Sequence, residues 1–300
     1  MSAVTCRPYR EGDEVGIRAL YTSVFGLDVD EAMWAWAYRR PKGTVIVVLE
    51  RAGSIVGHYA LQARPFVRDG RLVQAGLAIG LMVRSDARNV RSLVDMHKLA
   101  TDLARDQGMS FLYAFPNPAS RKVHRQLFGW AAVGELAEWE GPPPSASAAG
   151  ERGCELPASA LVAPVGVAVG YRDHGWNTWR FVDKPGAEYV FHYAAGSYAV
   201  TKRYVRDKVP YIHIVDWQVP DGDAAIAAHL GSIGEQASAW GSDRLSAWAS
   251  RGSSLAHHLE QSGLAPVGRS TPLLVLDLDG ASPLPGLSRW CLWMADSDVY

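Results

Sequence analysis

The most regular hydrophobic pattern in the chain lies near the middle of its first half. The apolar run Leu77–Val83 is short and rich in Ile, Leu and Val, which predicts a buried strand. After a polar turn, apolar residues recur every three or four positions over Val90–Leu103, which predicts a helix that ends at Gly108. A second apolar run, Phe111–Phe115, predicts a strand parallel to the first. The pattern therefore predicts a right-handed strand–helix–strand crossover.

Shorter patterns around this unit predict an alternation of strands and helices up to about residue 140. Runs of β-branched residues predict strands, and three-to-four spacing that stops at Gly26 or Pro41 predicts helices. Asp69-Gly70 is a dipeptide typical of a two-residue hairpin turn. The predicted elements are a strand at 4–7, helices at 13–26 and 30–40, strands at 44–50 and 54–63, a strand from the hairpin turn to 83, a helix at 120–127 and a strand at 133–139.

Residues 141–150, with the sequence GPPPSASAAG, are typical of a linker because they offer little to bury. Beyond them, residues of the first part recur in three colinear blocks, at intervals of 143, 133 and 134 positions (179 − 36, 241 − 108 and 254 − 120). We interpret this recurrence as an internal duplication of domain size. The matched sets are Trp36, Gly43, Gly53 and Ser54 with Trp179, Gly186, Gly196 and Ser197; Gly108 and Phe115 with Gly241 and Trp248; and Ser120, His124, Gly129, Val133 and Gly134 with Ser254, His258, Gly263, Val267 and Gly268.

Composition restricts the class of protein. The chain of 300 residues is 48% hydrophobic and 20% charged, which is typical of a globular protein with one large domain or two ordinary ones. Its 30 basic and 31 acidic residues provide no overall field for nucleic acid or an anionic membrane. The charged N-terminus does not resemble a signal peptide, and no apolar run reaches the ~18 residues of a spanning helix. Three distant cysteines suggest neither disulfides nor zinc, so we expect a cytoplasmic protein without a metal.

The order of the predicted elements resembles the GCN5-related N-acetyltransferases, a family that transfers an acyl group from coenzyme A to an amine. The resemblance covers residues 1 to about 140 and, through the duplication, extends to the second part. It implies an α/β fold of two tandem acetyltransferase-like domains, each a mixed, mostly antiparallel, twisted sheet flanked by helices. The expected division is an N-terminal domain at 1–140 that carries the acyl-CoA site, a linker at 141–153 and a degenerate C-terminal domain at 154–300.

Members of this family carry a loop of the form Arg/Gln-x-x-Gly-x-Gly/Ala, whose amides bind the CoA pyrophosphate. In register this chain has RNVRSL, so Arg88 matches, whereas Arg91 and Leu93 replace the two small residues. CoA would therefore bind less deeply, use the Arg91 guanidinium, or not bind. The resemblance implies these acetyl-CoA-binding residues: Met82, Val83, Arg84, Arg88, Asn89, Val90, Arg91, Ser92 and Ser120. The alternative is that the arginines form a solvated face and that the side chains of Met82 and Val83 belong to the core.

Acyl transfer needs a neutral amine, a donor for the developing oxyanion and a proton for the leaving thiolate. Many relatives supply that proton from a tyrosine four residues before the glycine that aligns with Gly129, where this chain has Arg125. His58 is the candidate base, because the ordinary pKa of histidine suits proton transfer near neutrality; a hydrogen-bonded core histidine is the alternative. Tyr113 and Asn117 are further candidates, the first as an acid and the second as an oxyanion or substrate contact.

His124 recurs as His258, which favours a structural role for it. The second copy also lacks the arginine-bearing loop. Its equivalent, residues 219–226, places Asp221 and Asp223 where a pyrophosphate would lie, and Asp223 is predicted to cap a helix. We therefore expect the C-terminal copy not to bind CoA.

The last residues of the chain do not resemble a free tail. Trp290, Leu292 and Trp293 precede two aspartates, so we expect the tail to dock instead of fraying. Asp298 is a candidate for attracting and orienting an ammonium substrate, with solvated or turn-capping aspartates as the alternative.

Three short motifs resemble a bacterial subgroup of acetyltransferase-like proteins found with polysaccharide and antibiotic-sugar assembly: Phe115-Pro-Asn117, Gly129-Trp130 and Trp290–Asp298. The resemblance implies acyl transfer from acetyl-CoA to a small-molecule amine, such as an amino sugar or a natural-product intermediate, without a metal or a covalent enzyme intermediate. No nucleic-acid or membrane partner is expected, and the oligomeric state is left open. The alternative is a repurposed fold that has lost CoA and binds a small ligand.

Overall fold

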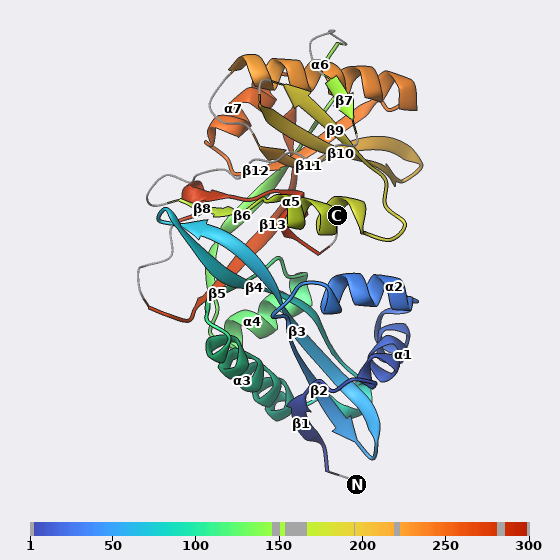
Figure 1. Cartoon of the computed structure of the whole chain (residues 1–300), viewed down its shortest axis with the longest axis vertical. Coiled ribbons are helices and arrows are strands. Elements are labelled where there is room, and N and C mark those ends of the chain that lie inside the picture. The colour runs from blue at the N-terminus through green and yellow to red at the C-terminus, as the bar shows by residue number, and fades with distance from the viewer. Residues whose placement is uncertain are drawn as a thin grey trace. The chain divides into compact units, whose positions relative to one another are not determined.

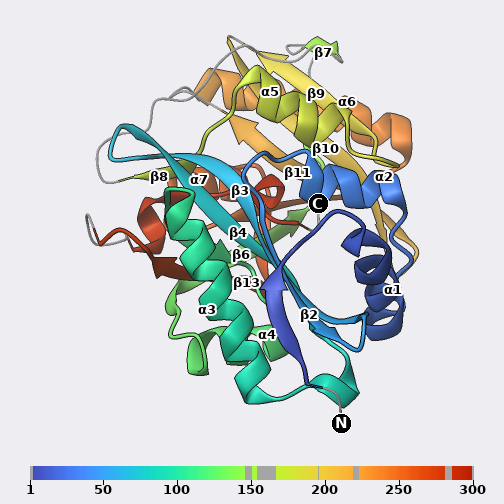
Figure 2. The same cartoon turned by 60° about the horizontal axis from the view of Figure 1, so that its bottom comes forward.

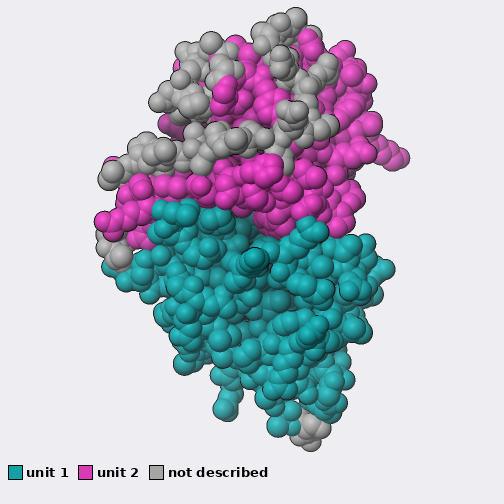
Figure 3. Space-filling view, in the orientation of Figure 1, with its two compact units in different colours: residues 1–66, 72–133, 272–284 teal, residues 67–71, 134–271, 285–300 magenta. Residues whose placement is uncertain are grey.

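The computed structural model describes residues 3–145, 151–153, 167–194, 196–218, 223–280 and 286–298. The chain divides into two compact units, each of which combines segments that are distant in sequence (Figure 3). The first unit comprises residues 1–66, 72–133 and 272–284, and the second comprises residues 67–71, 134–271 and 285–300. In the part of the chain that the structure describes, no helix has both the length and the hydrophobicity needed to cross a membrane.

The first unit alternates strands and helices as the hydrophobic pattern predicts. Its elements are β1 (Thr5–Pro8), α1 (Asp13–Phe25), α2 (Glu31–Trp34), the π-helix η1 (Ala35–Arg39), β2 (Val45–Arg51), β3 (Ser54–Arg68), β4 (Arg71–Val83), the 3₁₀ turn η2 (Ser85–Ala87), α3 (Val90–Asp106), β5 (Met109–Ala114) and α4 (Pro118–Gln126). The strand β13 (Ala265–Asp277) joins this unit with its residues from Pro272 onward.

The sheet of the first unit has the order β1-β2-β3-β4-β5-β13. β4 and β5 are parallel neighbours in the sheet, and α3 connects them in the sequence, which confirms the predicted crossover unit. Figures 1 and 2 show α3 and α4 on one face of this sheet and α1 and α2 on the other. The core under α3 contains Met96, Ala100 and Ala104, all buried, whereas Val90 and Val94 are exposed. The helix thus buries a stripe shifted from the one that its largest apolar residues suggest.

Side-chain caps explain where several helices begin. Each cap is a short polar side chain that accepts a hydrogen bond from a backbone amide three residues later, which satisfies one of the free donors at a helix start. The caps are Asp30 before α2, Asn89 before α3, Asn117 before α4, Asp173 before α5 (His174–Asn177) and Ser253 before α7 (Ser254–Gln261).

The second unit repeats much of this order. Its elements are β6 (Ala131–Gly141), β7 (Glu151–Gly153), β8 (Ala168–Gly170), α5 (His174–Asn177), the π-helix η3 (Thr178–Val182), β9 (Tyr189–Ala194), β10 (Ser197–Arg206), β11 (Val209–Gln218), α6 (Asp223–Trp240), β12 (Arg244–Ala249), α7 (Ser254–Gln261), the 3₁₀ turn η4 (Leu287–Arg289), β14 (Trp290–Cys291) and the 3₁₀ turn η5 (Met294–Asp296).

The sheet of the second unit has the order β6-β12-β11-β10-β9-β7, with β11 and β12 parallel. Buried residues of α6 and α7, such as Ile233 and Leu259, pack with Ala199 on one face of this sheet. The neighbouring Tyr198 points to the other face, where its hydroxyl donates to Asn177 of α5 at 3.4 Å. Each unit is therefore a sheet covered by helices, and the predicted fold class is confirmed.

The duplication is visible in backbone detail. α2 and η1 span residues 31–39, and α5 and η3 span residues 174–182, which is the interval of 143 found in the sequence (174 − 31). In both places an α-helical turn continues as a π-helix, a rare conformation. Gly53 and Gly196 both occupy the left-handed region, with φ of 76° and 74°, in the turn before the next strand. The predicted loop residues 219–222 and residues 146–150 of the linker lie outside the described residues.

The two copies exchange their last strands. β6 follows α4 in the first copy but pairs with β12, as in Ala247↔Trp139. β13 follows α7 in the second copy but pairs with β5, as in Leu274↔Ala114. Each compact unit is thus completed by a strand from the other copy. The boundary expected between residues 140 and 154 stays a prediction, and the compact units combine segments from both sides of it.

The exchange predicts that a residue near the C-terminus stabilises the unit built mainly from the N-terminal half. Leu274 is fully buried in the core of the first unit, so Leu274→Ala should lower the free energy of unfolding by about 2–5 kcal/mol. The control is Val267→Ala on the same strand, where the side chain is exposed and the expected loss is below about 0.5 kcal/mol. Denaturant unfolding of both variants measures the difference, and equal losses would show that β13 does not support this core.

Candidate functional site

The candidate site lies where strand β4 loses its neighbour β5. The two strands pair only from Gln74↔Met109 to Leu77↔Tyr113, whereas β4 continues to Val83. Over Ala78–Val83, one edge of β4 therefore has no partner from β5. Backbone N–H and C=O groups on such an edge can pair with an extended ligand as an added strand would.

Gly80 bends β4 within this unpaired stretch. Its φ of +62° is in the left-handed region, which glycine adopts without a steric cost. A Cβ at this position would lie 2.5 Å from the Tyr21 hydroxyl, 2.8 Å from the Tyr38 hydroxyl and 2.9 Å from Cε1 of His58. The two tyrosine hydroxyls also hydrogen-bond to each other. Three polar side chains from α1, η1 and β3 thus converge on one glycine, and a side chain at this position would have to displace them.

His58 is fully buried, and its ring nitrogens have different roles. Nδ1 lies 2.7 Å from the carbonyl oxygen of Gly80 and must donate, because a carbonyl oxygen only accepts. Nε2 therefore carries the free lone pair, and it is buried without a hydrogen-bond partner among the described residues. Burial lowers the pKa of His58 from its ordinary value to about 4, so the ring is neutral at pH 7.

The other candidate catalytic residues have different surroundings. Tyr113 is fully buried, and its ring packs edge-on against Phe66 on the face of the sheet that carries His58. Asn117 is exposed and caps α4 through the amide of Ser120 at 2.9 Å. Asp298 is exposed and belongs to the second unit. The part of these residues in catalysis stays a prediction.

Most arginines at the turn after β4 make contacts within the fold. Arg84 and Arg51 both bind the carboxylate of Asp86, and these contacts lower the pKa of Asp86 to about 2. Arg88 turns back and donates to the carbonyl oxygen of Val83 at 3.0 Å. Arg91 points into solvent with 92% of its side chain exposed, 3.7 Å from Asp95. Arg91 is the member of the set whose guanidinium is most accessible to an anion.

Helix α3 begins directly after this turn. Asn89 caps it by accepting from the amide of Ser92 at 2.8 Å, which leaves the amides of Val90 and Arg91 in the first turn. These amides and the helix dipole favour an anion. The side chains of Met82 and Val83 are buried in the core, as the alternative interpretation expects, so only their backbone can serve a ligand.

Ser120 and His124 form a structural pair at α4. Nδ1 of His124 donates to the carbonyl oxygen of Ser120 at 2.9 Å, and its Nε2 accepts from the hydroxyl of Tyr59 at 3.3 Å. Both nitrogens are thus used within the fold, in agreement with the structural role predicted for His124. The Ser120 hydroxyl lies 3.1 Å from the same Nδ1.

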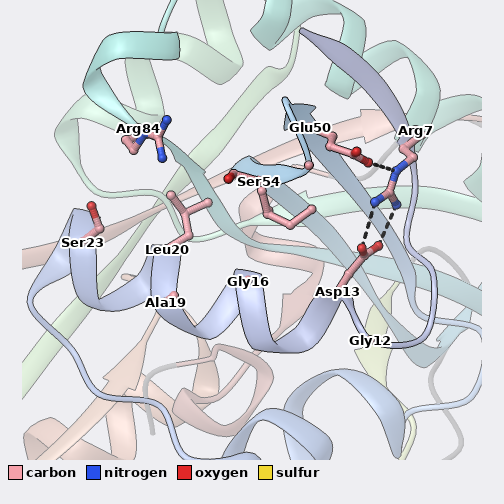
Figure 4. Close-up of a pocket in the computed structure, with 12 residues that line it drawn as sticks. Arg7, Gly12, Asp13, Gly16, Ala19, Leu20, Ser23, Glu50, Ser54 and Arg84 are labelled. Atoms are coloured by element: carbon pink, nitrogen blue, oxygen red, sulfur yellow. Dashed lines mark hydrogen bonds and ion pairs between the residues drawn. The ribbon is translucent and has the colours of Figure 1, made fainter.

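A pocket of about 460 Å³ opens beside α1 in the first unit (Figure 4). Arg84 lies at one side of it, and an ion-pair cluster of Arg7, Asp13 and Glu50 lies at the other. The pocket contains none of the four candidate catalytic residues. Within the described residues, no group of three or more His, Cys, Asp or Glu side chains could hold a metal ion.

The sequence analysis did not predict that Tyr21, Tyr38 and Gly80 belong to the candidate site. An isolated glycine in a strand pattern is a signal for a bulge, so Gly80 could have been noticed. The tyrosines carry no local signal, because they meet Gly80 only when α1 and η1 pack on the sheet.

Residues 5–133 match the family model described as an acetyltransferase (GNAT) domain. They are a GNAT acetyltransferase domain. Since this segment contains β4, Gly80, His58 and the start of α3, the candidate site lies within the GNAT domain. The predicted recognition and the predicted GNAT-type acetyltransferase are thereby confirmed.

Solved GNAT proteins share this fold over nearly the whole chain. A GCN5-related N-acetyltransferase from Kribbella flavida is 13% identical with a TM-score of 0.69, over 93% of this chain and 72% of that one. One from Anabaena variabilis is 11% identical with a TM-score of 0.70, over 92% and 73%. A tandem GNAT protein from the clavulanic acid biosynthesis pathway is 12% identical with a TM-score of 0.56, over 94% and 100%. No curated protein matches the sequence.

The buried state of His58 predicts how the stability of the GNAT domain depends on pH. The folded pKa of about 4 is below the ordinary value, so the unfolded chain binds a proton between pH 6.5 and 4 that the folded chain does not. The stabilisation is complete above pH 6.5 and decreases as the pH falls toward 4, by about 3 kcal/mol at ~1.4 kcal/mol per pH unit. Unfolding of His58→Gln at several pH values should show a shallower acid decline than the wild type.

The exposed His257 offers a matched control for this measurement. His257→Gln should leave the acid decline as in the wild type. If His58→Gln and the wild type lose stability in parallel from pH 6.5 to 4, His58 is not buried in its neutral form.

Proposed function

We propose that this protein is an N-acyltransferase that moves an acetyl or other short acyl group from coenzyme A to the amine of a small molecule, such as an amino sugar or a natural-product intermediate. The observation that supports this most is the free edge of β4 over Ala78–Val83, directly before the N-terminus of α3, inside the GNAT domain. The edge offers backbone pairs for an extended arm, and the helix start offers amides for phosphates.

The residues present fit acetyl-CoA in spite of the missing glycines. Leu93 packs into the core under α3, and Arg91 extends into solvent. Neither side chain is therefore buried against the amides of the first helical turn. We infer that phosphate groups meet these amides together with Arg88 and Arg91. When bound, acetyl-CoA supplies the acyl group as an activated thioester. Ser120 and Arg84 remain further candidate contacts.

The chain's own residues must then receive the amine and position the acyl group. A backbone N–H on the free edge of β4 can donate to the acyl carbonyl oxygen, on which negative charge develops as the amine adds. The new C–N bond forms, the C–S bond breaks, the amine loses its proton to a base and the thiolate gains one. His58 has the unprotonated Nε2 that a base needs, but a pKa near 4 makes it a weak proton acceptor.

We therefore infer that His58 acts first through Gly80. Its Nδ1–H holds the carbonyl of the bend in β4, and thus the course of the free edge that follows. Tyr113, Asn117 and Asp298 stay candidates for the acid, the oxyanion contact and the attraction of an ammonium group. The acceptor class is supported by the resemblance to proteins of sugar and antibiotic assembly, and by the fold shared with a tandem GNAT protein of clavulanic acid biosynthesis.

Calorimetric titration with acetyl-CoA, followed by incubation with a panel of amino sugars and alkyl amines, tests the proposal. We expect saturable heat and a product heavier by one acetyl group in mass spectrometry. No heat and no thermal shift at millimolar acetyl-CoA would refute the transferase and leave the small-ligand binding module as the function of the fold.

The donor side is tested by the double variant Arg88→Ala/Arg91→Ala. Two lost charge-assisted contacts at an exposed site should weaken CoA binding by about 2–4 kcal/mol, or roughly 30- to 1,000-fold. Lys98→Ala is the matched control, because Lys98 is an exposed cation further along the same helix. Calorimetry on the three proteins measures the effect, and unchanged affinity in the double variant would mean that these arginines are only surface residues.

A further inference from the structure

The second copy also contains two parallel strands, β11 and β12, that pair over only part of their length. β11 pairs with β12 from Tyr211↔Arg244 to Ile214↔Ala247 and then continues without β12 to Gln218, still paired with β10. In the turn before each strand, two residues have a left-handed backbone conformation: 69–70 before β4 and 207–208 before β11. Counted from these turns (207 − 69), Asp216 corresponds to Ala78 and Gln218 to Gly80. The stretch after Ile214 is therefore the counterpart of the free edge in the first copy.

The C-terminal segment of the chain packs against this stretch. Trp290 and Cys291 pair in parallel with Ala168 and Val169, and the following turn η5 packs against β11. Asp296 is 2% exposed, and Met294, Ala295 and Ser297 are fully buried. The predicted docking of the tail is thus confirmed for Trp290–Ser297. Asp296 is not solvated, but its Oδ2 accepts from the amide of Trp293 at 2.9 Å, so the turn-capping alternative holds for Asp296.

A buried charge cluster holds the segment. The guanidinium of Arg172 is bound by Asp216, with Nε at 3.0 Å from Oδ2, and by Asp296, with Nη2 at 2.8 Å from Oδ1. The same guanidinium lies 3.8 Å from the ring of Trp176. Arg180 adds a bond from its Nε to the carbonyl oxygen of Ala295 at 3.0 Å. Two arginines of the second copy thus donate hydrogen bonds to the tail, Arg172 to a carboxylate and Arg180 to a backbone carbonyl.

Gly170 leaves room for this contact. A Cβ on Gly170 would collide with both Arg172 and Asp296, so the backbone passes close to the ion pair. Burial raises the pKa of Asp216, while Arg172 opposes that shift. One guanidinium here faces two carboxylates, so loss of Asp296 would leave the Arg172–Asp216 pair in place and remove the shorter of the two hydrogen bonds that Nη2 of Arg172 donates.

We propose that residues 290–297 are an internal ligand of the second copy, and that Arg172 with Asp216 and Trp176 forms a carboxylate-binding site that Asp296 fills. The segment packs against β11, the counterpart of β4, and is joined to Asp216 through Arg172. The second copy is therefore closed to an extended ligand, and the free β4 edge has no working equivalent in the second half. This inference rests on the duplication and on the contacts of unit 2, and it holds whether or not the first copy binds CoA.

Chemical rescue of the full-length variant Asp296→Ala tests the proposal. The variant should melt about 10 °C below the wild type, because Nη2 of Arg172 and the amide of Trp293 both lose Asp296 as a buried hydrogen-bond acceptor. Sodium formate, a carboxylate small enough for the vacated space, should restore at least half of that loss, whereas sodium chloride at equal ionic strength should not. Asp243→Ala, which removes an exposed aspartate of the same unit, is the control and should melt as the wild type with or without formate.

A second variant covers the case in which Asp296→Ala does not fold. Asp296→Asn keeps the shape of the side chain and removes its charge, so the amides of residues 294–297 should exchange with deuterium at least tenfold faster than in the wild type. Unchanged melting of Asp296→Ala, equal rescue by formate and chloride, or unchanged exchange in Asp296→Asn would each overturn the proposal.

Discussion

The separation of β4 from β5 after Leu77 is the constraint on which the rest of this structure depends. A parallel strand pair needs a crossover connection, and α3 supplies it, so the helix start falls next to the end of β4. If the two strands stayed paired to their ends, the backbone groups of Ala78–Val83 would be used within the sheet. Because the strands separate early, those groups have no partner from β5, and the start of α3 follows after the six intervening residues 84–89. Backbone chemistry alone thus creates a place for a ligand with an extended arm and an anionic group.

The two copies treat this opening in opposite ways. In the first copy a neutral histidine holds the bend at Gly80, and the edge stays open. In the second copy Asp216 stands in the equivalent stretch, and a buried arginine links it to the chain's own tail. A neutral imidazole can be buried with one hydrogen bond, whereas a buried carboxylate needs a charged partner. Asp216, which stands where the first copy has Ala78, is therefore the residue that requires the buried Arg172 and links β11 to the tail of the chain.

Much of the fold was predictable from the sequence, because its signals are local. The Asp69-Gly70 turn, the helix stop at Gly108 and the crossover from β4 to β5 follow from turn chemistry and hydrophobic spacing. The strand exchange was not predictable, since β6 and β13 look alike and either could complete either sheet. The pairing of Arg172 with Asp296 also joins residues that are 124 positions apart, and no spacing rule connects them. Local patterns found the elements, and long-range packing decided their partners and the polar surroundings of His58.

The missing glycines of the phosphate loop have a physical consequence that differs from simple loss of the site. Glycine at these positions lets a phosphate approach the backbone closely, and that approach matters most when amides are the only donors. Here Arg91 and Leu93 lie in the first turn of α3, where one side chain enters solvent and the other enters the core. The amides before them keep the orientation of a helix start, and the accessible guanidinium of Arg91 adds a positive charge that glycine cannot supply. A phosphate at this turn would therefore exchange close backbone contact for a charge-assisted one, which makes its binding more dependent on ionic strength than in a glycine-lined loop.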